Sequence, residues 1–199
     1  MDKKIAIAQL KYLDKITPKI RLAAEWNQKW KVLISTILSS QTKDTKTIEI
    51  SNILYKKYPS LNKLANAKIK NIKNIIRPIN YYKTKSKHIL QTAKIILKKG
   101  IPKTIEGLLE LPGVGRKVAN VYLAVAHKKQ AIGVDTHVAR LSKKLGWTKE
   151  KNPHKIEKDL ENLFLKSYWK SINYILVRFG QTHGRSRKNE DLILKKIIK

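Results

Sequence analysis

The sequence predicts an all-α protein, and three observations support this fold class. Apolar residues recur at the i, i+3, i+4 spacing of an amphipathic helix in segments spread along the chain. No segment of strand length shows a convincing alternation of apolar and polar residues. Glycine and proline stand between the helical segments, where they end one helix or begin the next. The chain has 199 residues, of which 42% are hydrophobic, so it can bury a sizeable core.

The expected helices follow one another along the chain with short turns between them. They include residues 30–38, 47–55, 89–97, 118–126, 138–145, 156–165 and 172–179. Gly100 suits the left-handed cap that closes the third of these helices, and Gly146 ends the fifth. Asn152-Pro153 opens the sixth, because proline is well placed in the first turn of a helix.

The charge of the chain favours a polyanionic partner. Lysine and arginine number 44, against 14 aspartate and glutamate residues, so the formal net charge is +30 at pH 7. A surface this basic attracts phosphates and speeds encounter with them, which favours nucleic acid. The alternative is a lysine-rich composition that covers solvated helix faces without a partner. Charge alone does not separate DNA from RNA, or binding from catalysis.

Two absences restrict the chemistry and the compartment. The chain contains no cysteine, which excludes a disulfide framework, a thiolate nucleophile, cysteine-bound zinc and an iron–sulfur cluster. No stretch approaches the roughly 18 apolar residues of a membrane span, and no apolar signal segment follows Met1. We therefore expect a cytoplasmic protein with no membrane association.

One short motif predicts a turn that can bind an anion. Leu-Pro-Gly-Val-Gly-Arg-Lys contains Gly113, Val114 and Gly115, and glycine backbones make such a tight turn without strain. The next helix would then begin near Arg116, with its unpaired amide N–H groups and the positive end of its dipole facing outward. Arg116 and Lys117 add formal charge. The motif predicts a helix-hairpin-helix that holds a DNA backbone without reading bases, with an ordinary αα-turn as the alternative.

A second motif places a carboxylate at the start of another helix. Asp135, in Val-Asp-Thr-His-Val-Ala-Arg, lies 18 residues after Lys117 and directly before a helical pattern. Its carboxylate can accept hydrogen bonds from amides at the helix start and stay ionised there. Considered alone, such an aspartate is more often a helix N-cap than a catalytic group.

Together the two motifs resemble the signature of the endonuclease III family of helix-hairpin-helix DNA glycosylases. The resemblance extends over roughly residues 30–185 and includes the order and spacing of the motifs. It implies a two-lobed helix-hairpin-helix glycosylase fold with a cleft between the lobes. Residues 23–128 would form the helical lobe that carries the hairpin. Residues 1–22 and 129–199 would form the second lobe, which carries the catalytic aspartate.

The resemblance also implies an enzyme, a bifunctional DNA N-glycosylase and abasic-site lyase. Lys117 would be the nucleophile, and an ionised Asp135 would stabilise the oxocarbenium character that develops at C1′ as the damaged base leaves. A Schiff base at Lys117 would then allow β-elimination of the 3′ phosphate. The helix N-terminus and Arg116 favour the neutral amine that this attack needs. The implied partner is double-stranded DNA with a damaged base, an oxidised pyrimidine above all, or an abasic site, bound by a monomer.

Two further segments resemble the parts of the family that act when a base is extruded from the duplex. Gln41, in Leu-Ser-Ser-Gln-Thr-Lys-Asp, matches the glutamine that enters the space left by the base. Tyr81 stands at the family's wedge position, where an aromatic ring can stack on the orphaned base pair. Asn80 replaces the family's usual glycine, and we expect it to share that glycine's left-handed conformation.

The remaining candidate DNA-binding residues come from the two motifs. They are Gly113, Val114, Gly115, Arg116, His137 and Arg140. We expect His137 to act mainly as a structural residue that forms hydrogen bonds at the start of its helix.

The end of the chain departs from the family pattern. His-Gly-Arg at residues 183–185 resembles a family motif after which many members carry four cysteines that hold a 4Fe–4S cluster, and no cysteine follows here. The resemblance therefore implies a cluster-less member. Apolar residues in 191–198 predict a short terminal helix in place of the cluster loop, with lysine and arginine making the phosphate contacts. We expect no metal and no other cofactor, except that hairpin carbonyls could hold a monovalent cation.

Two other functions fit parts of the pattern. No motif identifies the residues that shape the base pocket, so 8-oxoguanine is an alternative to an oxidised pyrimidine. A non-catalytic helix-hairpin-helix protein that packages or tethers DNA is an alternative from another class. Such a protein would have no use for Gln41, Lys117 and Asp135 together.

Overall fold

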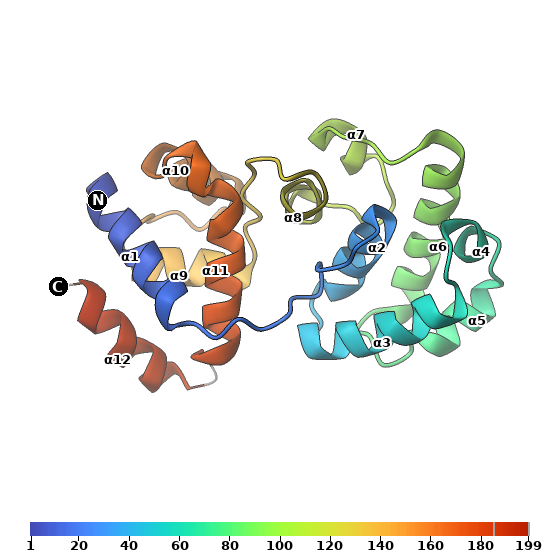
Figure 1. Ribbon diagram of the computed structural model, residues 1–199, viewed down its shortest axis with the longest axis horizontal. Helices are drawn as coiled ribbons and strands as arrows, with labels where there is room; N and C mark the ends of the chain where they lie inside the picture. Colours follow the sequence, from blue (N-terminus) through green and yellow to red (C-terminus); the bar gives the residue numbers. More distant parts are fainter. Residues whose placement is uncertain (185, 199) are drawn as a thin grey trace. The chain divides into compact units, whose positions relative to one another are not determined.

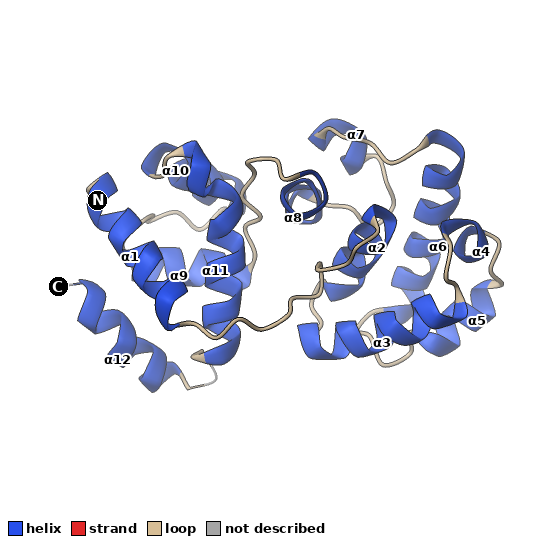
Figure 2. Ribbon diagram, in the orientation of Figure 1, coloured by secondary structure: helices blue, strands red, loops and turns tan. Residues whose placement is uncertain are grey.

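The computed structural model describes residues 1–184 and 186–198, and within them the regular secondary structure is helical throughout (Figures 1 and 2). This confirms the predicted all-α class. The chain divides into two compact units, Arg21–His127 and Met1–Ile20 with Lys128–Lys199. Among the described residues, no helix combines the length and apolar character that crossing a membrane requires.

The unit formed by Arg21–His127 is built around a central helix, α2. Its helices are α2 (Lys29–Ser39), α3 (Asp44–Lys57), α4 (Leu61–Ala65), α5 (Ile69–Ile75), α6 (Tyr82–Lys99), α7 (Ile105–Leu109) and α8 (Arg116–His127). Eight of the eleven residues of α2 are buried, as in a helix that is apolar on all sides. It packs against α3, α6 and α8, while α6 also covers α4 and α5 (Figure 1).

The other unit joins the two ends of the chain. Its helices are α1 (Lys3–Ile16), α9 (Thr136–Lys144), α10 (Pro153–Leu163), the 3₁₀-helix η1 (Lys166–Tyr168), α11 (Trp169–Thr182) and α12 (Arg187–Ile198). Helix α11 packs against α1 and α9. The fully buried Arg178 of α11 donates to the carbonyl oxygens of Thr17 and Pro18, at 3.0 and 3.1 Å. This contact holds the segment after α1 to the C-terminal half of the chain.

The predicted helix boundaries agree with the structure where capping residues mark them. Gly100 ends α6 as expected with a positive φ of +79°, but its ψ of 168° is not that of the predicted left-handed cap, and Gly146 follows α9 with φ +74°. Asn152 caps α10 by accepting hydrogen bonds from two backbone amides. The apolar spacing predicted a helix only from residue 89, whereas α6 begins at Tyr82. The first turns of α6 contain a buried polar residue, Lys85, where an apolar one would be expected. The apolar spacing therefore does not reveal these turns.

Candidate functional site

The predicted hairpin lies between α7 and α8, and its tight turn depends on Gly113. This glycine has φ +79°, and a Cβ atom there would approach Nδ1 of His88 to 2.9 Å, so both backbone and space require glycine. Thr92 of α6 ties the turn down by donating to the Pro112 carbonyl oxygen at 2.8 Å. Gly115, by contrast, has open space where a Cβ atom would lie, and its φ is not positive. Only Gly113 has a backbone conformation that requires glycine, whereas we expected this of both glycines.

The residues after the turn are arranged as an exposed helix start. Val114 is buried, so only its backbone can face a ligand, while Gly115 and Arg116 are exposed. Helix α8 begins at Arg116, as predicted, and Lys117 is half-buried in its first turn. The predicted nucleophile therefore lies at the exposed start of α8, where unpaired amide N–H groups and the positive end of the helix dipole are found.

A second lysine, Lys85 of α6, lies close to Lys117 and was missed by sequence reasoning. Its side chain is only 6% exposed, and its Nζ donates to the carbonyl oxygens of Leu38 and Ser40, at 2.7 and 2.5 Å, where α2 ends. Burial, and then repulsion from the Lys117 charge, lower the pKa of Lys85 to about 8. The signal in the sequence was weak, since one lysine among many marks no special site.

The two predicted base-extruding residues share an unusual backbone conformation. Gln41 and Tyr81 have φ values of +55° and +58°, and both side chains are exposed, Tyr81 by 66%. The prediction that Asn80 takes the left-handed conformation is wrong. Tyr81, as the N-cap of α6, occupies it instead, and the Asn80 side-chain amide donates to the Gln41 carbonyl oxygen.

The second motif forms the start of α9 in the other unit. Asp135 is the N-cap of this helix, because its Oδ1 accepts a hydrogen bond from the Val138 amide at 2.8 Å. His137 packs so closely on α11 that a Cβ atom at Gly180 would overlap its imidazole ring. Its ring also lies 3.4 Å from the Arg140 guanidinium. His137 therefore has the structural environment that we expected of it.

Arg140 belongs to an ion-pair network that sequence reasoning missed. Its guanidinium contacts Glu190 of α12, whose side chain is fully buried. Lys144 also contacts Glu190 at 2.8 Å, and reaches Asp191 at 2.6 Å. Burial would raise the pKa of the Glu190 carboxyl, but the hydrogen bonds and charges of Arg140 and Lys144 outweigh it and keep the pKa below its usual value. The network joins α12 to α9.

The C-terminal segment forms a longer helix than the predicted 191–198. Helix α12 begins at Arg187, and Leu194 is buried on it while Leu192 is about half exposed. Arg185, the last residue of the His-Gly-Arg motif, lies outside the described residues. That lysines and arginines of this segment contact phosphates stays a prediction.

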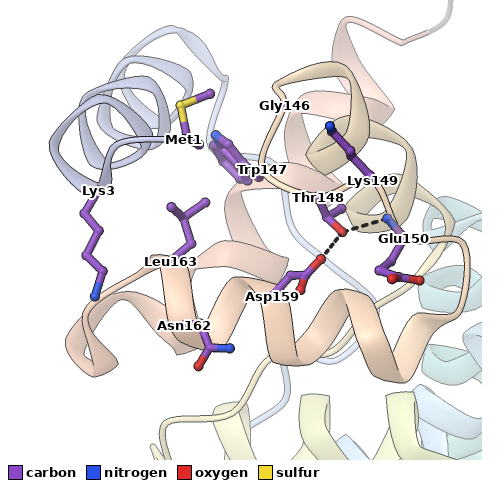
Figure 3. A pocket seen from close by; sticks show the side chains of 10 residues that line it. All are labelled: Met1, Lys3, Gly146, Trp147, Thr148, Lys149, Glu150, Asp159, Asn162 and Leu163. Carbon is purple, nitrogen blue, oxygen red and sulfur yellow. Dashed lines mark hydrogen bonds between the residues drawn. The ribbon is translucent and has the colours of Figure 1, made fainter.

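An open pocket of about 480 Å³ lies in the unit that contains α1 and α10, and its lining is shown in Figure 3. Thr148 there donates to Asp159 at 2.5 Å. None of the predicted site residues lines this pocket, and we assign it no function. Residues 1–184 and 186–198 contain no group of three or more His, Cys, Asp or Glu side chains placed to hold a metal ion.

Comparison with known proteins gives consistent matches. The HhH-GPD superfamily base excision DNA repair protein family matches residues 34–166. Endonuclease III of Thermotoga maritima is 40% identical over 155 residues, which cover 76% of this chain and 73% of that protein. Endonuclease III of Synechocystis sp. is 34% identical over 180 residues, which cover 88% of this chain and 82% of that protein.

Solved structures with a similar fold include the same kind of protein as these relatives. A trapped endonuclease III–DNA covalent intermediate superposes with a TM-score of 0.86 at 29% identity, covering 94% of this chain and 90% of the other. A non-covalent endonuclease III–DNA complex gives the same TM-score at 28% identity, covering 94% and 89%. A thermostable thymine-DNA glycosylase, at 17% identity and a TM-score of 0.82, shares the fold.

Proposed function

Since the chain belongs to the endonuclease III family of HhH-GPD base excision repair DNA glycosylases, we propose that it excises oxidised pyrimidines from duplex DNA and cleaves the strand at the resulting abasic site. The observation that carries this proposal is the position of Lys117, half-buried in the first turn of the helix after the hairpin. With no cysteine, the chain has no ligands for an iron–sulfur cluster.

The proposed reaction follows from the chemistry of a lysine amine. The Lys117 Nζ attacks C1′, the glycosidic bond breaks, and the base leaves with its electron pair. Opening of the sugar ring gives an iminium ion, which acidifies the proton on C2′. Loss of that proton breaks the C3′–O bond, so the 3′ phosphate leaves. A covalent endonuclease III–DNA intermediate in one of the similar structures supports covalent chemistry of this kind.

The surroundings of Lys117 support the binding of DNA. The buried Lys85 adds a basic group near Lys117, and burial together with the Lys117 charge lowers the pKa of Lys85 to about 8. The exposed start of α8 presents amide N–H groups to a phosphate. The net charge of +30 favours the approach to duplex DNA. We propose that the protein acts on DNA as a monomer.

One gel tests both the activity and the substrate class. Duplex oligonucleotides that carry thymine glycol, 8-oxoguanine, uracil or an abasic site are incubated with the protein, with and without borohydride. We expect a trapped adduct and a nicked strand with thymine glycol and with the abasic site, and neither with undamaged duplex. Absence of any adduct at the abasic site would refute the lyase, and reaction with 8-oxoguanine alone would refute the proposed substrate class.

Replacing Asp135 with asparagine should separate its two roles. Asparagine caps a helix as well as aspartate does, so the melting temperature should stay near that of the wild type. The negative charge is lost, and we expect base excision to slow roughly 10²–10³-fold, as when one electrostatic contact to a transition state is removed. Asp2→Asn is the matched control, because Asp2 caps α1 in the same way. A loss of stability with an unchanged excision rate would mean that Asp135 serves only as a cap.

Replacing Tyr81 with alanine should affect steps that need base extrusion. Tyr81 is 66% exposed, so the change removes little packing within the protein. Loss of stacking on the orphaned base pair should slow excision from duplex about tenfold or more, with a smaller effect on cleavage at a pre-made abasic site. Tyr81→Phe keeps the ring and should behave like wild type. Equal slowing of both reactions by the alanine variant would argue against a wedge.

A further inference from the structure

Gln41 and Tyr81, the two exposed residues proposed to enter the duplex, are held in a strained backbone conformation. In the described part of the chain, the left-handed region contains three non-glycine residues, and Gln41 and Tyr81 are two of them. This region is sterically unfavourable for residues with a Cβ atom, so surrounding contacts must compensate.

Side-chain contacts from the segment around Tyr81 hold the Gln41 turn, in addition to the local backbone hydrogen bond from the Thr42 amide to the Ser39 carbonyl oxygen at 3.0 Å. Asn80, directly before Tyr81, donates its side-chain amide to the carbonyl oxygen of Gln41. Lys85, one turn into α6, bonds to the Leu38 and Ser40 carbonyl oxygens. The same ammonium group lies 3.2 Å from the Thr42 hydroxyl on the other side of Gln41. Groups before, at and after Gln41 are therefore all bound by residues 80–85.

We propose that Asn80 is a positioning residue that joins the Gln41 turn to the Tyr81 turn, so that both side chains enter a DNA duplex as one preformed unit. The inference deepens the proposed function and rests on it, because it concerns how that site extrudes a base. Lys85 forms the buried base of the unit, and Asn80 makes the link directly at the two exposed tips. A glycine at this position would have no side chain with which to make the link.

The link matters because inserting two side chains into a base stack requires both at the same time. If the Gln41 turn relaxes in the free protein, part of the binding energy is used to order it again, and the rate of extrusion falls. Cleavage of a single-stranded abasic oligonucleotide needs no insertion into a stack. Its rate should therefore not depend on Asn80.

The test replaces Asn80 with aspartate, which has the same shape but cannot donate to a carbonyl oxygen, and with glycine. The matched control is Asn74→Asp, which makes the same chemical change at an exposed position of α5. Amide hydrogen exchange at Gln41 and Thr42 is measured without DNA. Single-turnover excision from a thymine glycol duplex is compared with cleavage of a single-stranded abasic oligonucleotide.

We expect both Asn80 variants to exchange the Gln41 and Thr42 amides about fivefold faster, the change that one hydrogen bond supports. Duplex excision should slow by a similar factor, while single-strand cleavage and the melting temperature stay at wild-type values. In the Asn74→Asp control, amide exchange, duplex excision, single-strand cleavage and the melting temperature should all stay at wild-type values. Unchanged exchange in Asn80→Asp, or equal slowing on duplex and single strand, would overturn the inference. If the wild-type protein excises no base, the proposed function fails, and the exchange rates still decide whether Asn80 holds the turn.

Discussion

Replacing Lys117 with alanine is expected to abolish strand scission and the borohydride-trapped adduct, while duplex DNA binding changes by only a few-fold. The reaction that we propose needs a primary amine at C1′, and we assign that amine to Lys117. Binding should persist because most of the affinity comes from many phosphate contacts around a chain of net charge +30. Adduct formation on an abasic duplex, together with a binding titration at fixed salt, measures both quantities.

Two variants make this result specific. Lys117→Arg keeps the positive charge but has no nucleophilic amine, so it should bind like wild type and form no adduct. Lys83→Ala removes a positive charge from an exposed position of α6 and should keep the adduct. Adduct formation at the wild-type level in Lys117→Ala would mean that another amine is the nucleophile. Lys85 would then be the first to examine, because it lies close to Lys117 and its pKa is lowered to about 8.

Replacing Glu190 with alanine is expected to cause a large loss of stability. The fully buried carboxylate contacts Arg140 and Lys144, and its removal leaves two cations of α9 without this partner. Breaking a buried ion pair on one side costs roughly 3–5 kcal/mol. For a chain of this size each kcal/mol lowers the melting temperature by roughly 2–4 °C, so a fall of about 10 °C is expected. Thermal unfolding followed by circular dichroism at pH 7 measures it.

The acid dependence of stability provides an independent check on Glu190. Because the pKa of Glu190 is lower in the folded protein than its usual value of 4.5, the stability that it contributes is present above pH 4.5. That contribution is lost as the pH falls through the folded pKa. The difference in unfolding free energy between wild type and Glu190→Gln should therefore be constant at neutral pH and shrink below about pH 4.5. A difference that does not change in acid would contradict the assigned ionisation.

Replacing a glutamate in an exposed ion pair separates the effect of the buried network from the effect of losing any negative charge. Glu49 forms an exposed ion pair with Lys46 on α3, and both side chains are about half exposed. Surface pairs of this kind contribute about 0–1 kcal/mol. Glu49→Ala should therefore leave the melting temperature within a few degrees of wild type, and a loss as large as that of Glu190→Ala would remove the special role of Glu190.

The network around Glu190 also shows how the C-terminal segment folds in a chain without cysteine. Lys144 contacts both acidic residues at the start of α12, and hydrogen bonding to Lys144 lowers the pKa of Asp191. Gly184 makes room for the approach of Glu190, since a Cβ atom at Gly184 would lie 2.8 Å from its Oε2. Polar contacts as well as the apolar residues of the tail thus attach α12 to its unit.

The sequence was sufficient for several features that depend on a single residue and its near neighbours. The start of α8 at Arg116, the cap at Gly100 and the capping role open to Asp135 follow from local preferences of glycine, charged and capping residues. The absence of cluster ligands follows from composition alone. The all-α class was clear because the apolar spacing of the long helices is a local pattern as well.

Polar contacts between distant segments could be found only in the folded chain. Asn80 meets Gln41 across 39 residues, Lys85 meets Leu38 across 47, and Arg140 meets Glu190 across 50. No local preference reports such partners, because a lysine, asparagine or glutamate has the same pattern in sequence whether it faces water or a buried carbonyl. Tyr81 rather than Asn80 has the left-handed conformation, and the Asn80 side chain contacts the distant carbonyl oxygen of Gln41. Packing brings these groups together, and around the buried Lys85 and Glu190 it selects the partners, because an unpaired polar group away from water is costly.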